Sequence, residues 1–513
     1  MIRTMKILEA CMKKLDGISL SIDDLVEIAK GNQKVSISEA SKDKIIASRL
    51  IVEDMVKHKK HVYGVNTGFG KLCDEKISCE ALNSLQVNLL RSHACGVGET
   101  FSIDVVRAMM ALRINALVKG YSGIRLETIE KLLELLNHNL IPVVYTQGSL
   151  GASGDLVPLA HMALPLIGEG EVWVNNERVH ADKALKEAGV KPLEELHAKE
   201  GLALINGTQA MTAVAALALD EAENLLHHAT LSASLTMEAL KSIIDAFDER
   251  VHKVRNHEGQ QVIAQEIRKY LEESQNITHQ GELRTQDAYS IRCIPQVHGA
   301  IYDTINYVRS VIEKEMNAVT DNPIIFEGEE AISAGNFHGQ PIALVMDYLA
   351  IAMSEIANIS ERRIERLVNP CLNGDLPAFL VKIRGLNSGF MIAQYAAASL
   401  VSENKILSHP ASVDSIPSSA NQEDHVSMGT IAARKARQII KHGYDVIAIE
   451  VFTACQAIDF EAKDKLSPSL KVVHEKVRKE VPFIEEDQMM QPLIEIVKKI
   501  IDQGILIKEV KHG

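Results

Sequence analysis

Aromatic residues are scarce in this sequence, and their scarcity argues against a fold built mainly from β-sheets. Phe, Tyr and Trp make up only 4% of the 513 residues, whereas Ala, Leu and Glu are abundant. The abundant residues are good helix formers, and aromatic residues are enriched in strands. We therefore expect a mainly α protein, in which a long-helix bundle accompanies a mixed, loop-rich N-terminal part with short β-hairpins.

The cysteines lack the pairing and the spacing of a disulfide framework or a zinc site. Their number is odd and no two form a C-x-x-C pair, which fits a reducing compartment. Residues 1–17 contain no uninterrupted apolar segment and do not resemble a signal peptide. We expect a cytoplasmic protein without a metal site. The seven cysteines are Cys11, Cys73, Cys79, Cys95, Cys293, Cys371 and Cys455.

An excess of positive charge and long apolar runs are also missing. The chain has 55 Lys and Arg against 68 Asp and Glu, a net charge of −13, which argues against nucleic acid as a partner. The apolar run 210–219 is followed by Asp220, and the run 342–346 is followed by Asp347. Such runs are too short to cross a membrane, so we expect no membrane partner.

What the sequence does contain is helical periodicity, mostly after residue 200. Apolar residues recur every three or four positions from Pro341 to Ile359, with Val345, Tyr348, Leu349, Ala352 and Ile356 between them. Similar patterns predict helices over 297–319 and 431–458. Residues 210–219 are apolar on nearly every face, so this segment should be buried inside a bundle.

The first 200 residues are more mixed, and we expect two regions that form one compact body. Residues 1–205 contain the glycine-rich loops GVNTGFG and GSLGASG and the predicted hairpin EVWVNNERVH, which turns at Asn175-Asn176. This N-terminal platform would present the loops. Residues 206–513 would form the bundle and the C-terminal helices. The sequence has no internal repeat or low-complexity linker.

The stretch GSLGASGDLVPLAH, residues 148–161, is unusually rich in glycine and serine. It is not a hydrolase elbow, G-x-S-x-G, because Asp155 stands where the second glycine belongs. No phosphate-binding loop is present either, since Lys71 lacks the glycine and hydroxyl residue that the motif requires around it. An ordinary alternative is that Ser153 or Asp155 caps a helix over the following apolar residues.

A covalent alternative uses the same residues. In a tight, strained turn, the amide nitrogen of Gly154 can attack the carbonyl carbon of Ala152, an approach that a Cβ at position 154 would obstruct. Loss of water closes a five-membered ring. Loss of a second water from the Ser153 side chain leaves a methylidene conjugated to the ring, which is a carbon electrophile that no ordinary side chain provides.

This stretch resembles the signature of the aromatic amino acid ammonia-lyases, the histidine and phenylalanine ammonia-lyase family. Five further motifs follow the family in order: YGVNTGFG, NGTQA, QDAYSIRC, GNFHGQP and SANQEDHVSMG. The resemblance implies that Ala152, Ser153 and Gly154 form a 4-methylidene-imidazol-5-one (MIO) prosthetic group, without pyridoxal phosphate or NAD. It also implies a homotetramer whose active sites are shared between subunits.

The resemblance assigns roles to two groups of residues. Tyr63 matches the family's catalytic tyrosine and would remove the β-proton, for which the site must favour the phenolate. Arg292 would bind the substrate carboxylate through its two parallel donors. Tyr289 and Gln286 precede it at intervals of three, so one helical face could present all three side chains. Taken alone, Tyr63 could anchor a loop and Arg292 could form a surface ion pair.

Two more residues are placed at the substrate by the resemblance. Asn206 interrupts an apolar run, and a buried amide needs partners. The family places it beside the prosthetic group and the substrate carboxylate, whereas in isolation it could be a helix cap. Phe337, in GNFHGQP, resembles an aromatic residue of the substrate pocket, although a phenylalanine that fills a gap in the core is an alternative.

Two short regions resemble the histidine branch of the family. Ser92 and His93 stand where phenylalanine enzymes carry an apolar pair, and Glu423 stands where they carry Asp in Asn-Gln-Asp. Glu423 and His93 are suited to an imidazole ring, because they can hydrogen-bond to it or share its proton. The resemblance thus implies elimination of ammonia from L-histidine to give trans-urocanate, the first step of histidine degradation.

Other functions stay open at this point. Within the family, the alternatives are a tyrosine or phenylalanine ammonia-lyase or an aminomutase. Outside it, the chain could be an inactive helical scaffold of the same fold. The fumarase and argininosuccinate-lyase group also has long helices, but its G-S-S-x-M-P loop is absent, since IPSSANQ at residues 416–422 does not match it.

Overall fold

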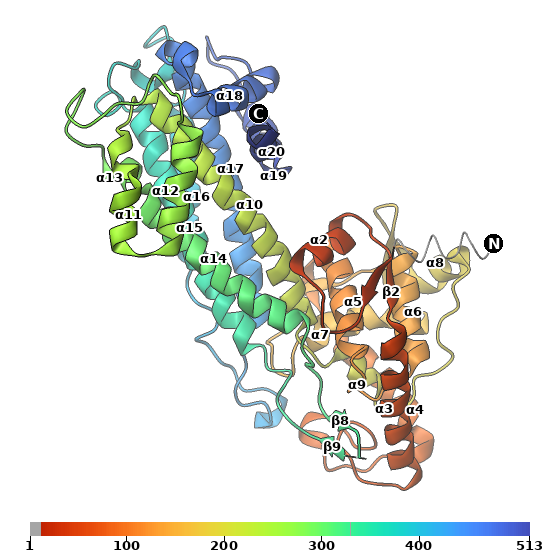
Figure 1. The fold of residues 1–513 in the computed structure, drawn as a ribbon. Helices are drawn as coiled ribbons and strands as arrows, with labels where there is room; N and C mark the ends of the chain where they lie inside the picture. The colour runs from red at the N-terminus through yellow and green to blue at the C-terminus, as the bar shows by residue number, and fades with distance from the viewer. Residues whose placement is uncertain (1–11, 329, 513) are drawn as a thin grey trace. The chain divides into compact units, whose positions relative to one another are not determined.

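The computed structural model describes residues 12–328 and 330–512, and helices dominate it, as predicted (Figure 1). The strands are short and form four small sheets. The predictions for Cys11 and for most of the N-terminal stretch lie outside the described residues.

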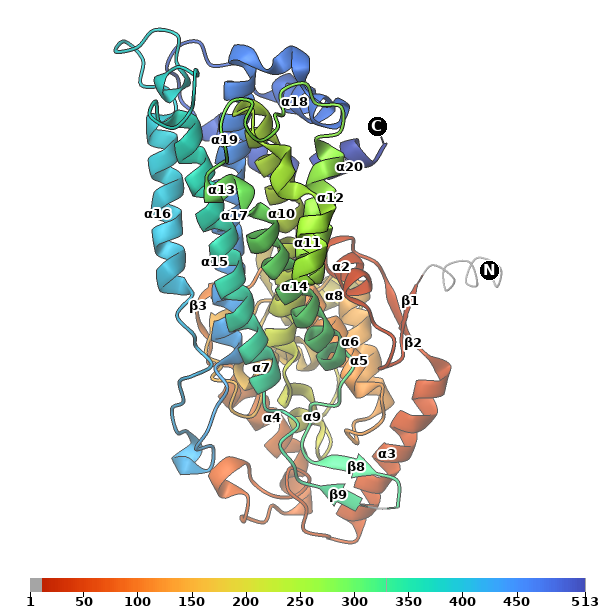
Figure 2. The same ribbon diagram turned by 60° about the vertical axis from the view of Figure 1, so that its left-hand side comes forward.

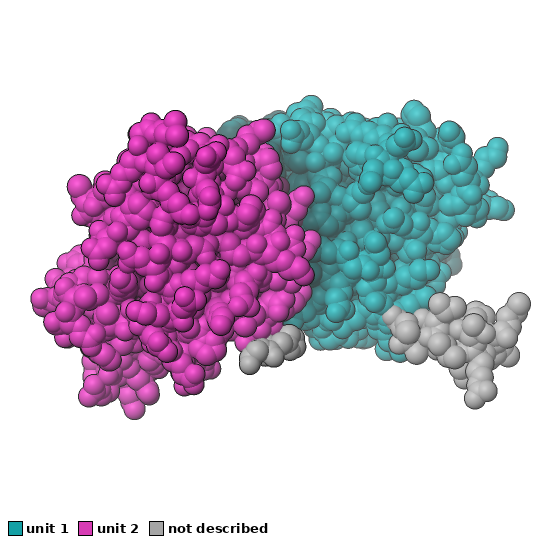
Figure 3. Space-filling view, turned by 90° about the horizontal axis from the view of Figure 1, so that it is seen from above, with its two compact units in different colours: residues 1–220, 309–346, 410–434 teal, residues 221–308, 347–409, 435–513 magenta. Residues whose placement is uncertain are grey.

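The chain divides into two compact units that interleave in the sequence. Unit 1 contains residues 1–220, 309–346 and 410–434, and unit 2 contains residues 221–308, 347–409 and 435–513 (Figure 3). The predicted boundary at residue 205 therefore does not coincide with the units, because two later segments return to unit 1. That both parts form one compact body stays a prediction.

Unit 1 combines short helices with four small sheets. Its helices are α2 (Ile22–Lys30), α3 (Glu39–Lys57), α4 (Leu82–His93), α5 (Ile103–Leu117), α6 (Leu126–Asn137), α7 (Leu156–Ala163), α8 (Ala181–Ala188) and α9 (Glu200–Ile205). The paired strands are β1 (Lys13–Leu15) with β2 (Val35–Ile37), β3 (Val97–Thr100) with β5 (Tyr145–Gln147), β4 (Ile141–Pro142) with β6 (Glu171–Val174) and β7 (Glu177–His180), and β8 (Ile324–Phe326) with β9 (Glu330–Ile332).

The hairpin of β6 and β7 confirms the predicted turn. Asn175 and Asn176 both have positive φ, 50° and 65°, as a two-residue type I′ turn requires. Asparagine tolerates this left-handed conformation better than most residues because its side chain can bond locally. The turn sequence was therefore sufficient to predict this element.

Helix α5 is the buried centre of unit 1. Every residue from Val105 to Leu117 is buried, and the helix packs against α2 and α6. Two arginines on this helix, Arg107 and Arg113, are only 2% and 1% exposed. A nearby group of helices, α4, α7 and α9, packs together and carries the loops described below. Buried arginines need hydrogen-bond partners, and those of Arg113 lead directly to these loops.

Four long helices have residues in both units. They are α10 (Gln209–Ala239), α14 (Ile294–Met316), α15 (Gln340–Val368) and α17 (Gly429–Glu461). The predicted burial of residues 210–219 is confirmed, because none of them is more than 2% exposed. The three predicted helices are also present. Tyr348 departs from the predicted apolar face of α15, since its side chain is 47% exposed.

Unit 2 is a helical bundle with a buried polar centre. The side chains of Glu450 on α17 and Arg363 on α15 are fully buried and paired, with Nε 2.6 Å from the carboxylate. Glu450 also accepts hydrogen bonds from Thr236 on α10 and from Ser360. Removing one partner of such a pair costs about 3–5 kcal/mol. These contacts fix the three helices, which lie side by side in Figures 1 and 2.

The remaining helices of unit 2 are shorter. They are α11 (Glu249–Arg255), α12 (Glu258–Tyr270), α13 (Tyr289–Arg292), α16 (Met391–Leu407), α18 (Pro468–Glu480), α19 (Gln491–Asp502) and α20 (Ile505–His512). Helix α12 packs against α11, and α20 packs against α18 and α19.

Helix α15 corrects one prediction from the sequence. By length and composition alone it could cross a membrane, in spite of Asp347, whereas the apolar runs were predicted to be too short. However, 67% of its most apolar 18-residue window is buried inside the structure. That pattern is typical of a core helix, which passes the same test of length and composition.

Candidate active site

The Ala-Ser-Gly stretch lies in a loop between β5 and α7. Several glycines make the backbone conformation of this loop possible. Gly151 and Gly154 have φ values of 65° and 76°, in the left-handed region where side chains are disfavoured. An ideal Cβ built on Gly154 would come closer than 3.0 Å to the backbone of Gly207, which real Cβ atoms essentially never do. The backbone of Gly207 therefore passes directly against Gly154.

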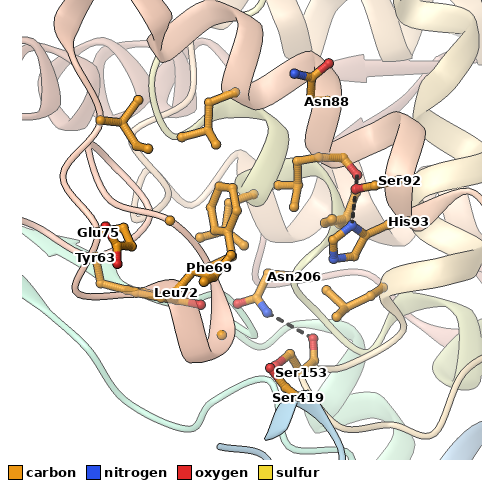
Figure 4. Close-up of a pocket in the computed structure, with 18 of the residues that line it drawn as sticks. Tyr63, Phe69, Leu72, Glu75, Asn88, Ser92, His93, Ser153, Asn206 and Ser419 are labelled. Atoms are coloured by element: carbon orange, nitrogen blue, oxygen red, sulfur yellow. Dashed lines mark hydrogen bonds between the residues drawn. The ribbon is translucent and has the colours of Figure 1, made fainter.

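The segment Asn206-Gly207 holds this loop from both sides of Gly154. The Asn206 side chain donates from Nδ2 to the carbonyl oxygen of Ser153 at 2.9 Å, as Figure 4 shows. The carbonyl oxygen of Gly207 accepts a hydrogen bond from the Asp155 amide at 2.7 Å. Asn206 does end helix α9, as its helix-cap alternative required, but its side chain is directed at the loop.

Asp155 does not cap helix α7, which corrects the helix-cap alternative. It occupies the N-cap position, but no side-chain cap bond forms there. Its fully buried carboxylate accepts hydrogen bonds from the Met211 amide at 2.7 Å and from Ser149 at 2.9 Å, and it also bonds Thr430. Burial raises the pKa of Asp155, and these donors oppose that rise. Asp155 thus connects the loop to the start of α10 and to α17.

Glu423 reaches the same loop from a tight turn late in the chain. Residues Ser419, Ala420 and Asn421 all have positive φ, and the backbones of Ser418 and Glu423 pair across the turn. The Ser153 hydroxyl donates to Glu423 Oε1 at 2.8 Å, and the Ser418 hydroxyl donates to Oε2 at 3.0 Å. Two residues that are 270 positions apart in the sequence are therefore hydrogen-bonded.

Tyr63 faces the same pocket, but its environment disfavours the phenolate. Burial raises the pKa of Tyr63, a backbone hydrogen bond from Gly70 lowers it, and the charges of Glu423, Cys73 and Asp321 raise it further. The prediction that the site favours the phenolate is therefore wrong for the single chain. None of these influences is a cation, and only a positive charge or a further donor would reverse the shift.

His93 ends helix α4 and contacts its neighbour Ser92. The Ser92 hydroxyl lies 3.0 Å from Nδ1 of His93, as Figure 4 shows, and donates its own proton to the Leu89 carbonyl. Burial lowers the pKa of His93, whereas a hydrogen bond to Leu89 and the charge of Glu423 oppose that shift. Burial thus favours the neutral ring, in which one nitrogen is available as an acceptor.

These side chains line two adjoining cavities of about 520 Å³ and about 470 Å³. Tyr63, Ser153, Asn206 and Glu423 line both cavities. His93 lines only the larger cavity, and Phe337 lines only the smaller one. The structure thus brings together six of the predicted residues, all in unit 1. Each cavity is large enough for an amino acid substrate.

Several lining residues were not predicted from the sequence. The larger cavity has an apolar wall, and Ser419 approaches Gly70 on its floor. A leucine or isoleucine in a loop or a helix carries no signal of a pocket, so the wall was not predictable. Ser419 could have been found from its place in SSANQED, close to Glu423. The apolar wall comprises Leu72, Ile77, Leu85, Leu89, Leu156, Leu202 and Ile205.

Gln286, Tyr289 and Arg292 form a separate cluster in unit 2. The Arg292 guanidinium donates to Gln286 Oε1 at 2.6 Å and lies 4.6 Å from the centre of the Tyr289 ring. Helix α13 begins only at Tyr289, so the predicted helical face does not include Gln286. Tyr289 is 70% exposed, and Nε of Arg292 is buried without a partner among the described residues. Neither cavity is lined by these three residues.

Comparison with known proteins places the chain among enzymes that act on aromatic amino acids. Residues 20–479 match the family model "Aromatic amino acid lyase". Histidine ammonia-lyase 2 of Fusobacterium nucleatum is 55% identical over 500 residues, which cover 97% of this chain and 98% of that protein. The relative is thus matched over nearly its whole length.

Solved structures with different substrates share the fold. Histidine ammonia-lyase from Trypanosoma cruzi has a TM-score of 0.90 at 44% identity, covering 98% of this chain and 95% of that one. Tyrosine aminomutase from Streptomyces globisporus has a TM-score of 0.94 at 37% identity, covering 98% of each chain. The backbone alone therefore does not distinguish the substrates, and the side chains in the pocket must do so.

Proposed function

Because the chain belongs to the aromatic amino acid lyase family, we propose that it is a histidine ammonia-lyase, which eliminates ammonia from L-histidine and releases trans-urocanate. It is a carbon–nitrogen lyase. The observation that carries the substrate assignment is the position of Glu423, whose carboxylate lies 2.8 Å from the Ser153 hydroxyl inside the pocket. A carboxylate at this point suits an imidazole ring, which can donate to it, whereas a phenyl ring offers it no donor and would only desolvate it.

We propose that Ala152, Ser153 and Gly154 form the MIO group by their own cyclisation, and the residues present fit it. Gly154 has no Cβ to obstruct its nitrogen, and the neighbouring Gly207 leaves no room for one. The Ser153 carbonyl oxygen, which the cyclisation retains, accepts the Asn206 hydrogen bond. When formed, the group supplies a carbon electrophile. Asn206 withdraws electron density from the Ser153 carbonyl through this bond.

Tyr63 is proposed as the base that removes the β-proton of the substrate. It lines both cavities together with Ser153, so a substrate bound there lies within its reach. Within one chain, burial and the charge of Glu423 hold its pKa high. A cation supplied by another subunit would lower that pKa, which is one reason why an assembled enzyme is needed.

His93 and Glu423 are proposed to hold the imidazole ring. The Ser92 hydroxyl donates to Leu89 and therefore accepts from Nδ1 of His93, which leaves Nε2 as the acceptor. An imidazole N–H of the substrate can donate to that nitrogen or to Glu423. The ring of L-tyrosine or L-phenylalanine cannot satisfy both groups, so these amino acids should be poor substrates.

The substrate carboxylate is proposed to bind the cluster of Gln286, Tyr289 and Arg292 from another subunit. The guanidinium offers paired donors for a carboxylate, and its buried Nε has no partner among the described residues. We propose a homotetramer with shared active sites, in which Phe337 closes the substrate pocket. The enzyme would be cytoplasmic, would bind neither nucleic acid nor membrane, and would need no pyridoxal phosphate or NAD.

The direct test is turnover of L-histidine by the purified protein. We expect formation of urocanate, followed by its ultraviolet absorbance, and release of ammonia without any added cofactor. The high TM-score to a tyrosine aminomutase makes L-tyrosine the appropriate competing substrate. Faster conversion of L-tyrosine than of L-histidine would contradict the substrate assignment. A well-folded protein that converts neither would be an inactive scaffold of the same fold.

A further inference from the structure

Behind the Asn206-Gly207 segment lies a buried arginine that no part of the reaction uses. Arg113, on α5, is 1% exposed and donates from Nη1 to the Asn206 carbonyl at 3.0 Å and to Gln209 Oε1 at 2.8 Å. Its Nη2 donates to the Ala203 carbonyl. The guanidinium thus binds the end of α9 and the start of α10, on either side of the segment that contacts the Ala-Ser-Gly loop.

Arg113 and Gly154 both pack closely against Gly207. A Cβ built on Gly207 would come closer than 3.0 Å to Nη1 of Arg113, to Gln209 Oε1 and to Thr320 Oγ1. A Cβ built on Gly154 would meet the backbone of Gly207 just as closely. The space beside the Gly207 Cα is therefore filled by Arg113, Gln209 and Thr320, while its backbone packs against Gly154. Close packing of this kind transmits a displacement directly from one group to the next.

The guanidinium remains charged in this position. Burial lowers the pKa of Arg113 to about 10, and the charge of Asp321 opposes that change. Asp321 is itself paired with the buried Lys199, whose Nζ lies 2.8 Å away. At neutral pH Arg113 therefore keeps all its donors, and charge-assisted bonds to the Asn206 and Ala203 carbonyls are stronger than neutral ones.

From these contacts we propose that Arg113 is a positioning residue for the cyclisation of Ala152, Ser153 and Gly154, acting through Asn206-Gly207. Arg113 fixes the segment that holds the Ser153 carbonyl and the Asp155 amide, and these two bonds keep Gly154 in the conformation that the ring closure requires. The inference rests on the proposed function, because the cyclisation is part of it.

The step that Arg113 assists balances without an oxidant or a co-reactant. The Gly154 nitrogen forms a bond to the Ala152 carbonyl carbon. The Ala152 oxygen then leaves as water with the amide protons of Gly154 and Ser153, and a carbon–nitrogen double bond forms. A second water takes the Ser153 hydroxyl and its α-proton, which leaves the methylidene. The mature chain is therefore lighter than its sequence by two waters.

Arg107 provides a matched control on the same helix. It is 2% exposed and likewise donates to carbonyl groups, those of Ile28 at 3.0 Å and Leu136 at 3.4 Å, and to the Asn139 side chain at 3.0 Å, and none of these bonds involves the Asn206-Gly207 segment. Replacing either arginine by methionine leaves buried carbonyls without a donor and should lower the melting temperature. Only the Arg113 variant should change the maturation of the loop.

The test measures the mass of the full-length chain at fixed times after induction of expression. We expect Arg113→Met to lose two waters at least about tenfold more slowly than Arg107→Met, because displacement of a reacting group by about 1 Å can slow a reaction on the order of 100-fold. Arg113→Lys, which keeps the charge but has a single donor nitrogen in place of the guanidinium's three, should mature at an intermediate rate. Equal maturation of the Arg113 and Arg107 variants would overturn the proposal.

Two further results keep the outcomes separate. If Arg113→Met does not fold, the comparison of Arg113→Lys with Arg107→Lys decides, and equal rates would again overturn the role of Arg113. If the wild-type chain itself never loses two waters, the proposed prosthetic group fails. If the wild-type chain and the Arg113→Met chain both lose two waters at the same rate, only the positioning role of Arg113 is contradicted.

Discussion

The Ala-Ser-Gly loop of unit 1 and the Gln286–Arg292 segment of unit 2 were both predicted to act on the substrate, yet the structure treats them differently. The loop is fixed by its own chain, through Asn206, Gly207 and Asp155. In the segment, Asp287 is bonded by Arg284 and by the Ile243 amide, whereas Arg292 bonds only Gln286 within the described part of the chain and Tyr289 is 70% exposed. The loop is thus hydrogen-bonded within one chain, whereas the segment keeps an exposed tyrosine and an Arg292 Nε that has no partner among the described residues.

The loop should give the largest effect on activity. Ser153→Ala removes the hydroxyl whose loss creates the methylidene, so activity should fall by at least about 10³-fold, as when a nucleophile is removed from other enzymes. The backbone contacts of the loop do not involve this hydroxyl, so the melting temperature should change little. Steady-state turnover of L-histidine and a thermal melt measure the two quantities. Retention of more than a tenth of the activity would contradict the assignment of Ser153.

Substitutions in the Gln286–Arg292 segment should have the next largest effect on activity, and they also test whether another subunit takes part in the site. Arg292→Ala should raise KM for L-histidine on the order of 100-fold, because a charge-assisted pair with the carboxylate is lost. When Arg292→Ala and Tyr63→Phe chains are mixed and reassembled, part of the activity should return if different subunits supply these residues. No recovery in verified mixed tetramers would show that one chain supplies both.

A neighbouring arginine serves as the control for this segment. Arg284 bonds Asp287 at 2.6 Å and the Leu240 carbonyl at 2.9 Å, so its donors are used within unit 2. Arg284→Ala should lower the melting temperature while leaving KM for L-histidine nearly unchanged. An equal rise in KM for both variants would mean that Arg292 acts by supporting the fold.

The sequence predicted the parts of this comparison that depend on local chemistry. The turn at Asn175-Asn176 followed from two residues that accept positive φ, and the burial of residues 210–219 followed from an apolar pattern on every face. The six residues that meet in the pocket were predicted only because six motifs occurred in the family's order. No local pattern indicates that Glu423 bonds Ser153.

The features that were predicted wrongly, or were not predicted, depend on contacts between residues that are far apart in the sequence. Asp155 has the position of a helix cap, but the Met211 amide and two hydroxyl groups compete for its carboxylate. The pKa of Tyr63 depends on burial and on Glu423, which is far away in the sequence. Arg113 carried no motif, because a buried arginine in a helix is visible only once its acceptors are known.

A substitution that removes the charge of Glu423 but keeps the shape of its side chain should have a smaller effect on activity. Glu423→Gln should lower activity with L-histidine about 10- to 100-fold, whereas Glu485→Gln, on an exposed carboxylate paired with Lys382, should have almost no effect. Because the charge of Glu423 raises the pKa of Tyr63, its removal should also move the acid limb of the pH–rate profile to lower pH. An unchanged limb would argue against Tyr63 as the base.

A substitution of His228, in the bundle of unit 2, should have the smallest effect on activity, because it changes the stability of the fold and not catalysis. Burial lowers the pKa of His228 to about 4, below its ordinary value of 6.5. The unfolded chain therefore binds a proton that the folded chain does not, so stability is lost as pH falls from about 6.5 towards 4, at about 1.4 kcal/mol per pH unit. His228→Gln should reduce this loss in thermal melts, whereas the exposed His279→Gln should not. If the two variants lose stability equally at acid pH, titratable groups other than His228 are responsible for that loss.

The proposed reaction depends on an electrophile that this chain makes from its own Ala152, Ser153 and Gly154. The most direct measurement is the mass of the peptide that contains these residues, taken from enzyme that is actively converting L-histidine. This peptide should be lighter than its sequence by two waters, with the loss located at residues 152–154. An unmodified mass in fully active enzyme would contradict it.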